Sequence, residues 1–201
     1  TKMSKEQLFI FDTTLRDGAQ TQGVDFSVDD KMKIASALDN LGVDYIEGGW
    51  PGANPTDTEF FQKKHSFNNA KLTSFGMTKR TGRSADNDPG LSALLNSNTP
   101  AVCIVGKSWD FHVDIALGIS NEENLENIKE TAKHFVKENK EFMFDAEHFF
   151  DGYKANPNYA LSCLKVAFDE GARWIVLCDT NGGTLPHEVT KIVIEVSKTI
   201  P

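Results

Sequence analysis

An arginine and an aspartate stand side by side in the segment 11–20, which reads Phe-Asp-Thr-Thr-Leu-Arg-Asp-Gly-Ala-Gln. The guanidinium of Arg16 has the fixed donors needed to hold a developing enolate or alkoxide oxygen. The carboxylate of Asp17 is a ligand type that hard divalent cations prefer. A simple Arg–Asp pair that ties down a loop explains these two residues equally well, so the segment alone leaves both interpretations open.

Polar side chains also follow other apolar runs of the chain. Glu47 ends one run, and two later runs lead into a further group: Asp145, Glu147, His148, Asp179, Thr180 and Asn181. Carboxylates and hydroxyls at the ends of buried segments are typical of a catalytic or binding surface. We therefore ask which fold would bring these ends together.

Short apolar runs alternate with amphipathic helical patterns along the whole sequence. The runs at 8–11, 45–47, 72–75, 101–105, 142–144 and 174–177 are expected to be strands. The helical patterns lie at 27–42, 55–64, 91–95, 122–137, 159–168 and 186–196. Consecutive βα units of this kind predict a parallel sheet with helical crossovers.

A TIM (β/α)8-type barrel is the predicted architecture, in preference to an open doubly wound sheet. In a closed barrel the strand ends that carry the polar residues converge on one face. The chain also lacks the Gly-rich phosphate loops that nucleotide-binding open sheets carry after a strand. Because a complete barrel takes roughly 250 residues, we expect residues 1–201 to be the N-terminal part of one, without its last two βα units and without a C-terminal regulatory region.

Composition narrows the possible partners. The net charge is −8, and no basic cluster is longer than Lys79-Arg80, which argues against nucleic acid. No apolar run approaches the ~18 residues of a membrane span, and the polar opening lacks a secretion signal. A cytoplasmic protein is predicted, with its cysteines as buried free thiols: Cys103, Cys163 and Cys178.

Three further segments complete a pattern with 11–20. They read Tyr-Ile-Glu-Gly-Gly-Trp-Pro-Gly at 45–52, Asp-Ala-Glu-His-Phe-Phe-Asp-Gly at 145–152 and Leu-Cys-Asp-Thr-Asn-Gly-Gly-Thr at 177–184. With them the chain resembles the DRE-TIM metallolyase superfamily, which includes isopropylmalate, homocitrate and citramalate synthases and hydroxymethylglutaryl-CoA lyase. The last two segments are most similar to the second type of citramalate synthase.

The resemblance implies a role for each matching residue. Asp17 would ligate a divalent metal (Mg²⁺, Mn²⁺ or Zn²⁺), and Arg16 would lie against the keto oxygen of the substrate. Glu147 would complete the Asp-Arg-Glu signature, and Thr180 would bind the carboxylate of the oxo acid. Further polar residues are expected around the substrate: Gln20, Glu47 and Asp179. Glu47 and Asp179 could instead only orient their neighbours.

The resemblance further implies an acyltransferase that joins acetyl-CoA to a 2-oxo acid. Pyruvate is the expected acceptor, giving (R)-citramalate for isoleucine biosynthesis, with a homodimer as the full-length form. The alternatives are 2-isopropylmalate synthase of leucine biosynthesis, homocitrate synthase, a hydroxymethylglutaryl-CoA lyase-like enzyme, or a non-catalytic barrel that serves as a binding or assembly module. A biotin-dependent carboxyltransferase has a related opening but typically continues Ala-His-Gln, where this chain has Gly18-Ala19-Gln20.

The quoted motifs supply only part of the metal site that the resemblance implies. Related enzymes complete the metal site with a His-x-His pair on the seventh strand, and none of the five histidines here has that spacing. We therefore expect the pair beyond Pro201 and expect the 201-residue chain to be inactive by itself.

Three apolar residues could either select the methyl group of pyruvate or belong to the core: Met77, Trp109 and Phe144.

Overall fold

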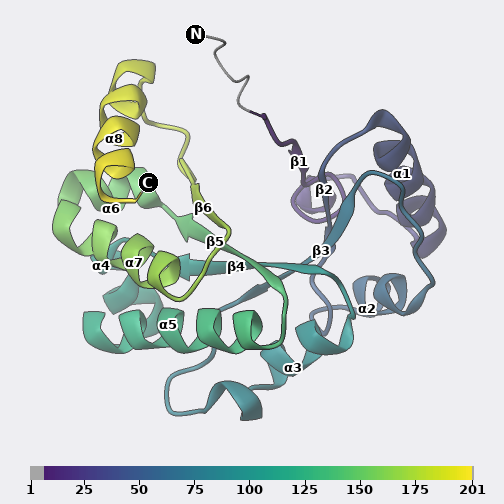
Figure 1. The fold of residues 1–201 in the computed structure, drawn as a ribbon, viewed down its shortest axis with the longest axis horizontal. Coiled ribbons are helices and arrows are strands. Elements are labelled where there is room, and N and C mark those ends of the chain that lie inside the picture. Colours follow the sequence, from purple (N-terminus) through teal and green to yellow (C-terminus); the bar gives the residue numbers. More distant parts are fainter. Residues whose placement is uncertain (1–6, 201) are drawn as a thin grey trace, which may run out of the picture.

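The computed structural model describes residues 7–200, and its parallel six-stranded sheet has the strands in chain order (Figure 1). Each strand pairs in parallel with the next, as expected for consecutive right-handed βα units. The strands are β1 Phe11–Asp12, β2 Tyr45–Gly49, β3 Lys71–Met77, β4 Ala101–Lys107, β5 Glu141–Glu147 and β6 Trp174–Leu177. The sheet is therefore part of a (β/α)8-type barrel, and the predicted fold class is confirmed.

Helices connect successive strands and cover the outer face of the curved sheet (Figure 1). The α-helices are α1 Val28–Leu41, α2 Pro55–Gln62, α3 Pro89–Asn96, α4 Asp110–His112, α5 Asn121–Lys137, α6 Phe149–Ala155, α7 Pro157–Asp169 and α8 Pro186–Thr199. Short 3-10 turns lie at Gly18–Gln20 and Ala85–Asn87, and a π-helical turn lies at Val113–Leu117. No helix in the described part of the chain is long and apolar enough to cross a membrane.

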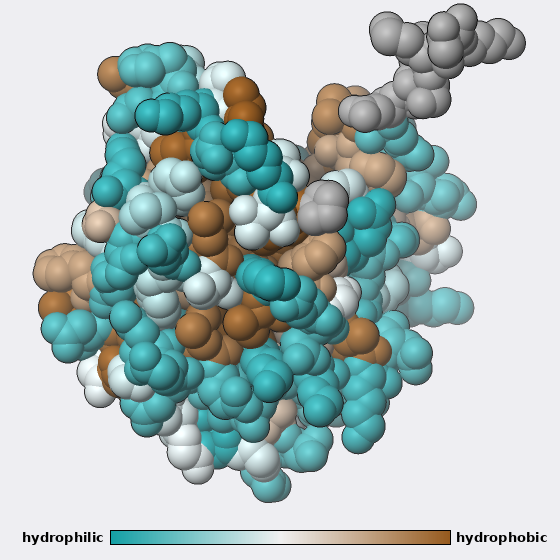
Figure 2. Space-filling model, turned by 60° about the vertical axis from the view of Figure 1, so that its left-hand side comes forward, coloured by the Kyte–Doolittle hydropathy of each residue, from teal (hydrophilic) through white to brown (hydrophobic). Residues whose placement is uncertain are grey.

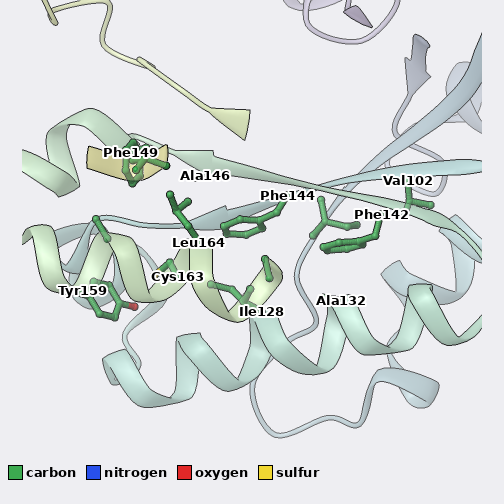
Figure 3. Close-up of a cluster of buried hydrophobic side chains, with 14 of the residues drawn as sticks. Val102, Ile128, Ala132, Phe142, Phe144, Ala146, Phe149, Tyr159, Cys163 and Leu164 are labelled. Atoms are coloured by element: carbon green, nitrogen blue, oxygen red, sulfur yellow. The ribbon is translucent and has the colours of Figure 1, made fainter. Parts of the chain in front are cut away.

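The main hydrophobic core lies between the sheet and its helices (Figure 3). Alternate residues of β5, Phe142 and Phe144, are buried there against Ile128 and Ala132 of α5. The intervening residue Met143 belongs to a separate cluster. Because side chains alternate across a strand, this second cluster lies on the inner face of the sheet, beneath the strand ends that carry the polar residues.

The β2–α2 turn is held by a buried ion pair. Lys31 of α1 is 1% exposed, and its Nζ atom contacts Oδ1 of Asp57. The other oxygen of Asp57 accepts a hydrogen bond from the backbone N–H of Trp50 at 2.8 Å. Gly49 has φ +145°, and a Cβ atom there would lie 2.5 Å from Asp57 Cγ. Glycine is therefore required for the turn that directs Trp50 over the end of the sheet.

The sheet has two open edges among the described residues. β1 pairs only with β2, and β6 pairs only with β5. Apolar side chains are exposed beside these edges: Leu8 (80%), Ile10 (49%) and Val176 (36%). Figure 2 shows hydrophobic residues in a hollow of this face, with a mainly hydrophilic surface around them.

The structure differs from the sequence predictions at several positions. The first strand is Phe11–Asp12 rather than 8–11, and α6 precedes the helix predicted at 159–168. Of the predicted thiols, Cys103 and Cys163 are buried, whereas Cys178 is partly exposed because it follows the last residue of the edge strand β6. Phe144 is a core residue, but Met77 is 44% exposed at the end of β3.

Candidate active site

Arg16 is the centre of the polar cluster at the carboxyl ends of the strands. Its Nε atom donates to Oε1 of Glu47 at 2.5 Å, and its Nη1 atom donates to Oδ1 of Asp17 at 3.2 Å. The guanidinium lies over the ring of Phe75, 3.9 Å from the ring centroid. Nη2 has no acceptor within residues 7–200, so this part of the guanidinium is available to a ligand. These contacts fix the direction of the free donor.

Glu47 lies at the bottom of the site as a completely buried carboxyl group. One ligand atom each from Glu47, Cys103 and Asp145 lie within 4.8 Å of one another. Burial raises the pKa of Glu47 to about 7, although the nearby Arg16 opposes this rise. Burial also raises the pKa values of Asp145 and of the Cys103 thiol. Burial thus disfavours the charged forms of all three groups, and Arg16 adds positive charge on one side, so this cluster suits a cation less well than exposed carboxylates do.

Glu147 lies at the end of β5 and faces Lys107 at the end of β4. The two residues are register partners, and Lys107 Nζ forms an ion pair with Oε2 of Glu147. The backbone oxygen of Glu147 accepts a hydrogen bond from the Ser108 hydroxyl at 2.8 Å. Glu147 therefore makes its charged contact with Lys107, whereas Glu47 is the glutamate that contacts Arg16.

The side chain of Thr180 is hydrogen-bonded to the backbone just beyond the end of β5. Its hydroxyl oxygen accepts from the N–H of His148 at 2.9 Å, which leaves the hydroxyl proton free to donate to a ligand. His148 has the left-handed value φ 51°, uncommon for a residue with a side chain. Asp151 Oδ2 lies 3.2 Å from Nδ1 of His148 and accepts from Asn181 at 3.0 Å. These bonds connect the loops that follow β5 and β6.

No hydrogen bond or ion pair within residues 7–200 joins two of the expected substrate-binding residues, Asp179 and Gln20, to Arg16 or Glu47. Asp179 accepts hydrogen bonds from the backbone and hydroxyl of Thr184, at 3.1 and 2.8 Å, so its carboxylate shapes its own loop. Gln20 is exposed and lines a pocket of about 370 Å³ together with Arg16, Trp50 and Asp57. Arg16 therefore belongs both to the polar cluster and to the lining of this pocket.

The mouth of the site carries one carboxylate that suits a divalent cation. The side chain of Asp17 is 65% exposed at the mouth of the site, and its Oδ2 atom has no donor within residues 7–200. A free carboxylate oxygen there suits a hard cation. None of the described histidines makes a three-ligand group with Asp17. Among the described residues, Asp17 therefore fits the role of one ligand of a metal site.

Lys107 was not expected at the site from the sequence, and Asp145 and His148 were expected only as polar residues at a strand end, without an assigned role. Lys107 lies two residues beyond the predicted end of its strand, and its position opposite Glu147 follows only from the register. The position of Asp145 could have been predicted, because it lies two residues before Glu147 on β5 and therefore on the same face of the sheet. The left-handed backbone of His148 left no signal in the sequence.

Relatives with established names match nearly the whole chain. Curated (R)-citramalate synthases from five species are 46–55% identical to it. The one from Aquifex aeolicus is 55% identical over 195 residues, which are 96% of this chain. A 2-isopropylmalate synthase from Sediminispirochaeta smaragdinae is 33% identical over 192 residues, again 96% of this chain. The chain spans 37% of the length of each of these two proteins.

Solved structures and a family model agree with the fold. The crystal structure of hydroxymethylglutaryl-CoA lyase from Pseudomonas aeruginosa superposes with a TM-score of 0.78 at 17% identity, covering 97% of this chain and 65% of that one. The model of the family described as HMGL-like matches residues 7–201. With its parallel barrel strands and with the Arg16–Asp17 pair at their carboxyl ends, the chain belongs to the HMGL-like family.

Proposed function

We propose that the full-length protein is an (R)-citramalate synthase, in which the acetyl methyl carbon of acetyl-CoA loses a proton and bonds to the keto carbon of pyruvate. Water then cleaves the thioester and releases citramalate and CoA. The observation that carries this proposal is the Arg16 guanidinium, which is oriented by Glu47 and Asp17 and keeps Nη2 free. The identity to curated (R)-citramalate synthases, 46–55%, favours this acceptor over that of the 2-isopropylmalate synthase at 33%.

Arg16 is proposed to stabilise the oxygen of the acceptor's keto group. As the new carbon–carbon bond forms, this oxygen gains negative charge, and a prepositioned donor lowers the energy of that state. The contacts of Nε and Nη1 hold the guanidinium plane still, so little reorganisation is needed. Glu47 therefore acts as a positioning residue through Arg16.

Thr180 and Asp17 are proposed to hold the rest of the acceptor. The hydroxyl proton of Thr180 is free to donate to a substrate carboxylate, because its oxygen accepts from His148. Asp17 would hold a divalent metal ion through its exposed carboxylate, with further ligands from residues outside 7–200. When bound, that ion supplies Lewis-acid polarisation of the keto group.

Glu147 is proposed to act near the acetyl group rather than on Arg16. Its ion pair with Lys107 fixes one oxygen, and Oε1 has no donor within residues 7–200. Asp179 and Gln20 were expected to bind substrate. We propose that Asp179 shapes its own loop and that Gln20 lines the neighbouring pocket. We assign no residue of this chain as the base that deprotonates the acetyl methyl group.

We further propose that residues 1–201 form the N-terminal part of the catalytic barrel. Both sheet edges are open, and apolar side chains are exposed beside them, as expected if two more βα units close the barrel. A homodimer and a cytoplasmic location remain predictions.

An acceptor screen tests this function. The full-length protein is incubated with acetyl-CoA, Mn²⁺ and one of three 2-oxo acids (pyruvate, 2-oxoisovalerate or 2-oxoglutarate), and thiol release is followed. We expect pyruvate to be the preferred acceptor in kcat/KM. A preference for either larger acid would replace the proposal by isopropylmalate or homocitrate synthesis, and the absence of turnover with all three would favour a non-catalytic barrel.

A further inference from the structure

Asp151 and His148 form a carboxylate–imidazole pair beyond the end of β5. Oδ2 of Asp151 lies 3.2 Å from Nδ1 of His148, and both side chains are only partly exposed. The same carboxylate oxygen accepts from the amide of Asn181 at 3.0 Å. A carboxylate at Nδ1 keeps the proton on that nitrogen, so Nε2 carries the free electron pair. Nε2 has no hydrogen-bond partner within residues 7–200 and is therefore available to accept a proton.

The backbone of His148 departs from the regular course of β5. A continuous strand would place this side chain on the face opposite to that of Glu147. The left-handed φ of 51° breaks this alternation immediately before α6 begins at Phe149. Residues held in this conformation cost free energy and are concentrated at functional sites. The turn therefore gives the imidazole a direction that the strand by itself would not.

Two aromatic rings of the loop after β4 hold the imidazole in place. The ring of His112 meets it edge-on, with the ring centroids 4.6 Å apart, and Trp109 lies 5.8 Å from it. Burial lowers the pKa of His112, and the neighbouring His148 and Lys107 lower it further. The charge of Glu147 opposes this change. The imidazole pair thus lies within electrostatic reach of Glu147, at the carboxyl ends of the strands.

His148 also holds the hydroxyl group that is proposed to bind the acceptor. Its backbone N–H donates to Oγ1 of Thr180 at 2.9 Å. The condensation product still carries CoA as a thioester, and two carbon atoms separate the thioester carbonyl from the carboxylate that Thr180 would bind. A base that acts on this carbonyl must therefore lie near Thr180, and His148 meets this requirement.

We propose that His148, oriented by Asp151, is the general base of the hydrolytic step. The inference rests on the proposed function, because that reaction produces the thioester. Nε2 takes a proton from a water molecule, and the oxygen of this water bonds to the thioester carbonyl carbon. The carbon–sulfur bond then breaks, the imidazolium gives its proton to the departing sulfur, and the new carboxylic acid releases a proton to solvent. The products are citramalate and CoA.

The first test separates hydrolysis from condensation in the full-length protein. His148→Asn removes the base, and asparagine tolerates a left-handed backbone better than most residues do. With acetyl-CoA, pyruvate and Mn²⁺, the quenched products should shift from citramalate to citramalyl-CoA, because loss of a general base slows its step by about 100-fold or more. Asp151→Asn should give a smaller shift in the same direction. Mass spectrometry quantifies both products.

The matched control is a second histidine–aspartate pair, on the other side of the sheet's end. Nδ1 of His134 on α5 lies 3.3 Å from Oδ1 of Asp86. His134→Asn should keep the wild-type ratio of the two products. A wild-type ratio in His148→Asn would overturn the proposal. An equal fall of both steps with a lowered melting temperature would also overturn it and would indicate a purely structural pair.

Supplied citramalyl-CoA tests the base without the condensation. In the presence of Mn²⁺ the wild type should hydrolyse it, and His148→Asn should do so about 100-fold more slowly. Hydrolysis that depends on His148, in a protein that forms no citramalate from acetyl-CoA and pyruvate, would support the base and reject the proposed synthase. No hydrolysis by the wild type, or equal rates in the two proteins, would reject the base whatever the enzyme condenses.

Discussion

The substitution Glu47→Gln should make the stability of the protein less dependent on pH. The pKa of this buried carboxyl is raised by burial from 4.5 to about 7. The folded state therefore holds the proton more tightly than the unfolded chain does. The stability that Glu47 contributes is complete below about pH 4.5 and is lost as the pH rises through about 7.

The size of this effect follows from the shift. Each unit of pKa corresponds to about 1.4 kcal/mol, so a rise from 4.5 to about 7 corresponds to about 3 kcal/mol. Glutamine resembles the protonated form in shape and can still accept from Nε of Arg16. The variant should match the wild type near pH 4.5 and exceed its unfolding free energy by up to about 3 kcal/mol near pH 8.

The free energy of unfolding of both proteins is measured across this pH range by urea unfolding, followed by tryptophan fluorescence. The matched control is Glu59→Gln, which changes an exposed carboxylate on α2 and should give a difference that is nearly independent of pH. If the difference between wild type and Glu47→Gln stays constant from pH 4.5 to 8, the raised pKa of Glu47 is refuted.

Three further substitutions in the full-length protein test separate contacts. Arg16→Lys should lower kcat by about 100-fold, a loss of roughly 3 kcal/mol, because lysine lacks the planar fork; near-normal kcat with a changed melting temperature would support a purely structural pair instead. Asp17→Asn should weaken metal binding in calorimetric titrations, and excess metal should restore part of the activity; unchanged affinity would remove Asp17 from the metal site. Lys31→Met should cost about 3–5 kcal/mol in urea unfolding, because Asp57 would lose its buried partner; a loss below about 1 kcal/mol would contradict this.

The repeating pattern of the chain was sufficient to predict the barrel architecture. Buried strands and amphipathic helices have different periods, and each unit of this protein shows both. The first strand was misplaced because Leu8 and Ile10 are exposed beside an open edge, although their residue types suggest a buried strand. Apolar character cannot distinguish a strand in the sheet from a segment next to its edge.

The candidate site was only partly predictable for a similar reason. The Arg16–Asp17 pair was singled out by its residue types and spacing, and Thr180 by the family resemblance; their roles stay predictions. Glu47 rather than Glu147 contacts Arg16 because β2 lies next to β1, whereas β5 lies next to β4 and pairs Glu147 with Lys107. This choice depends on the strand order and not on a local pattern.

The formation of a new carbon–carbon bond is the central claim. Full-length protein with Mn²⁺, pyruvate and acetyl-CoA labelled with ¹³C in the acetyl methyl group is examined by NMR. The account predicts that the label appears in the methylene group of citramalate and that Arg16→Lys suppresses this signal. Label found only in acetate would mean that the protein hydrolyses the thioester without condensation, which would contradict the account.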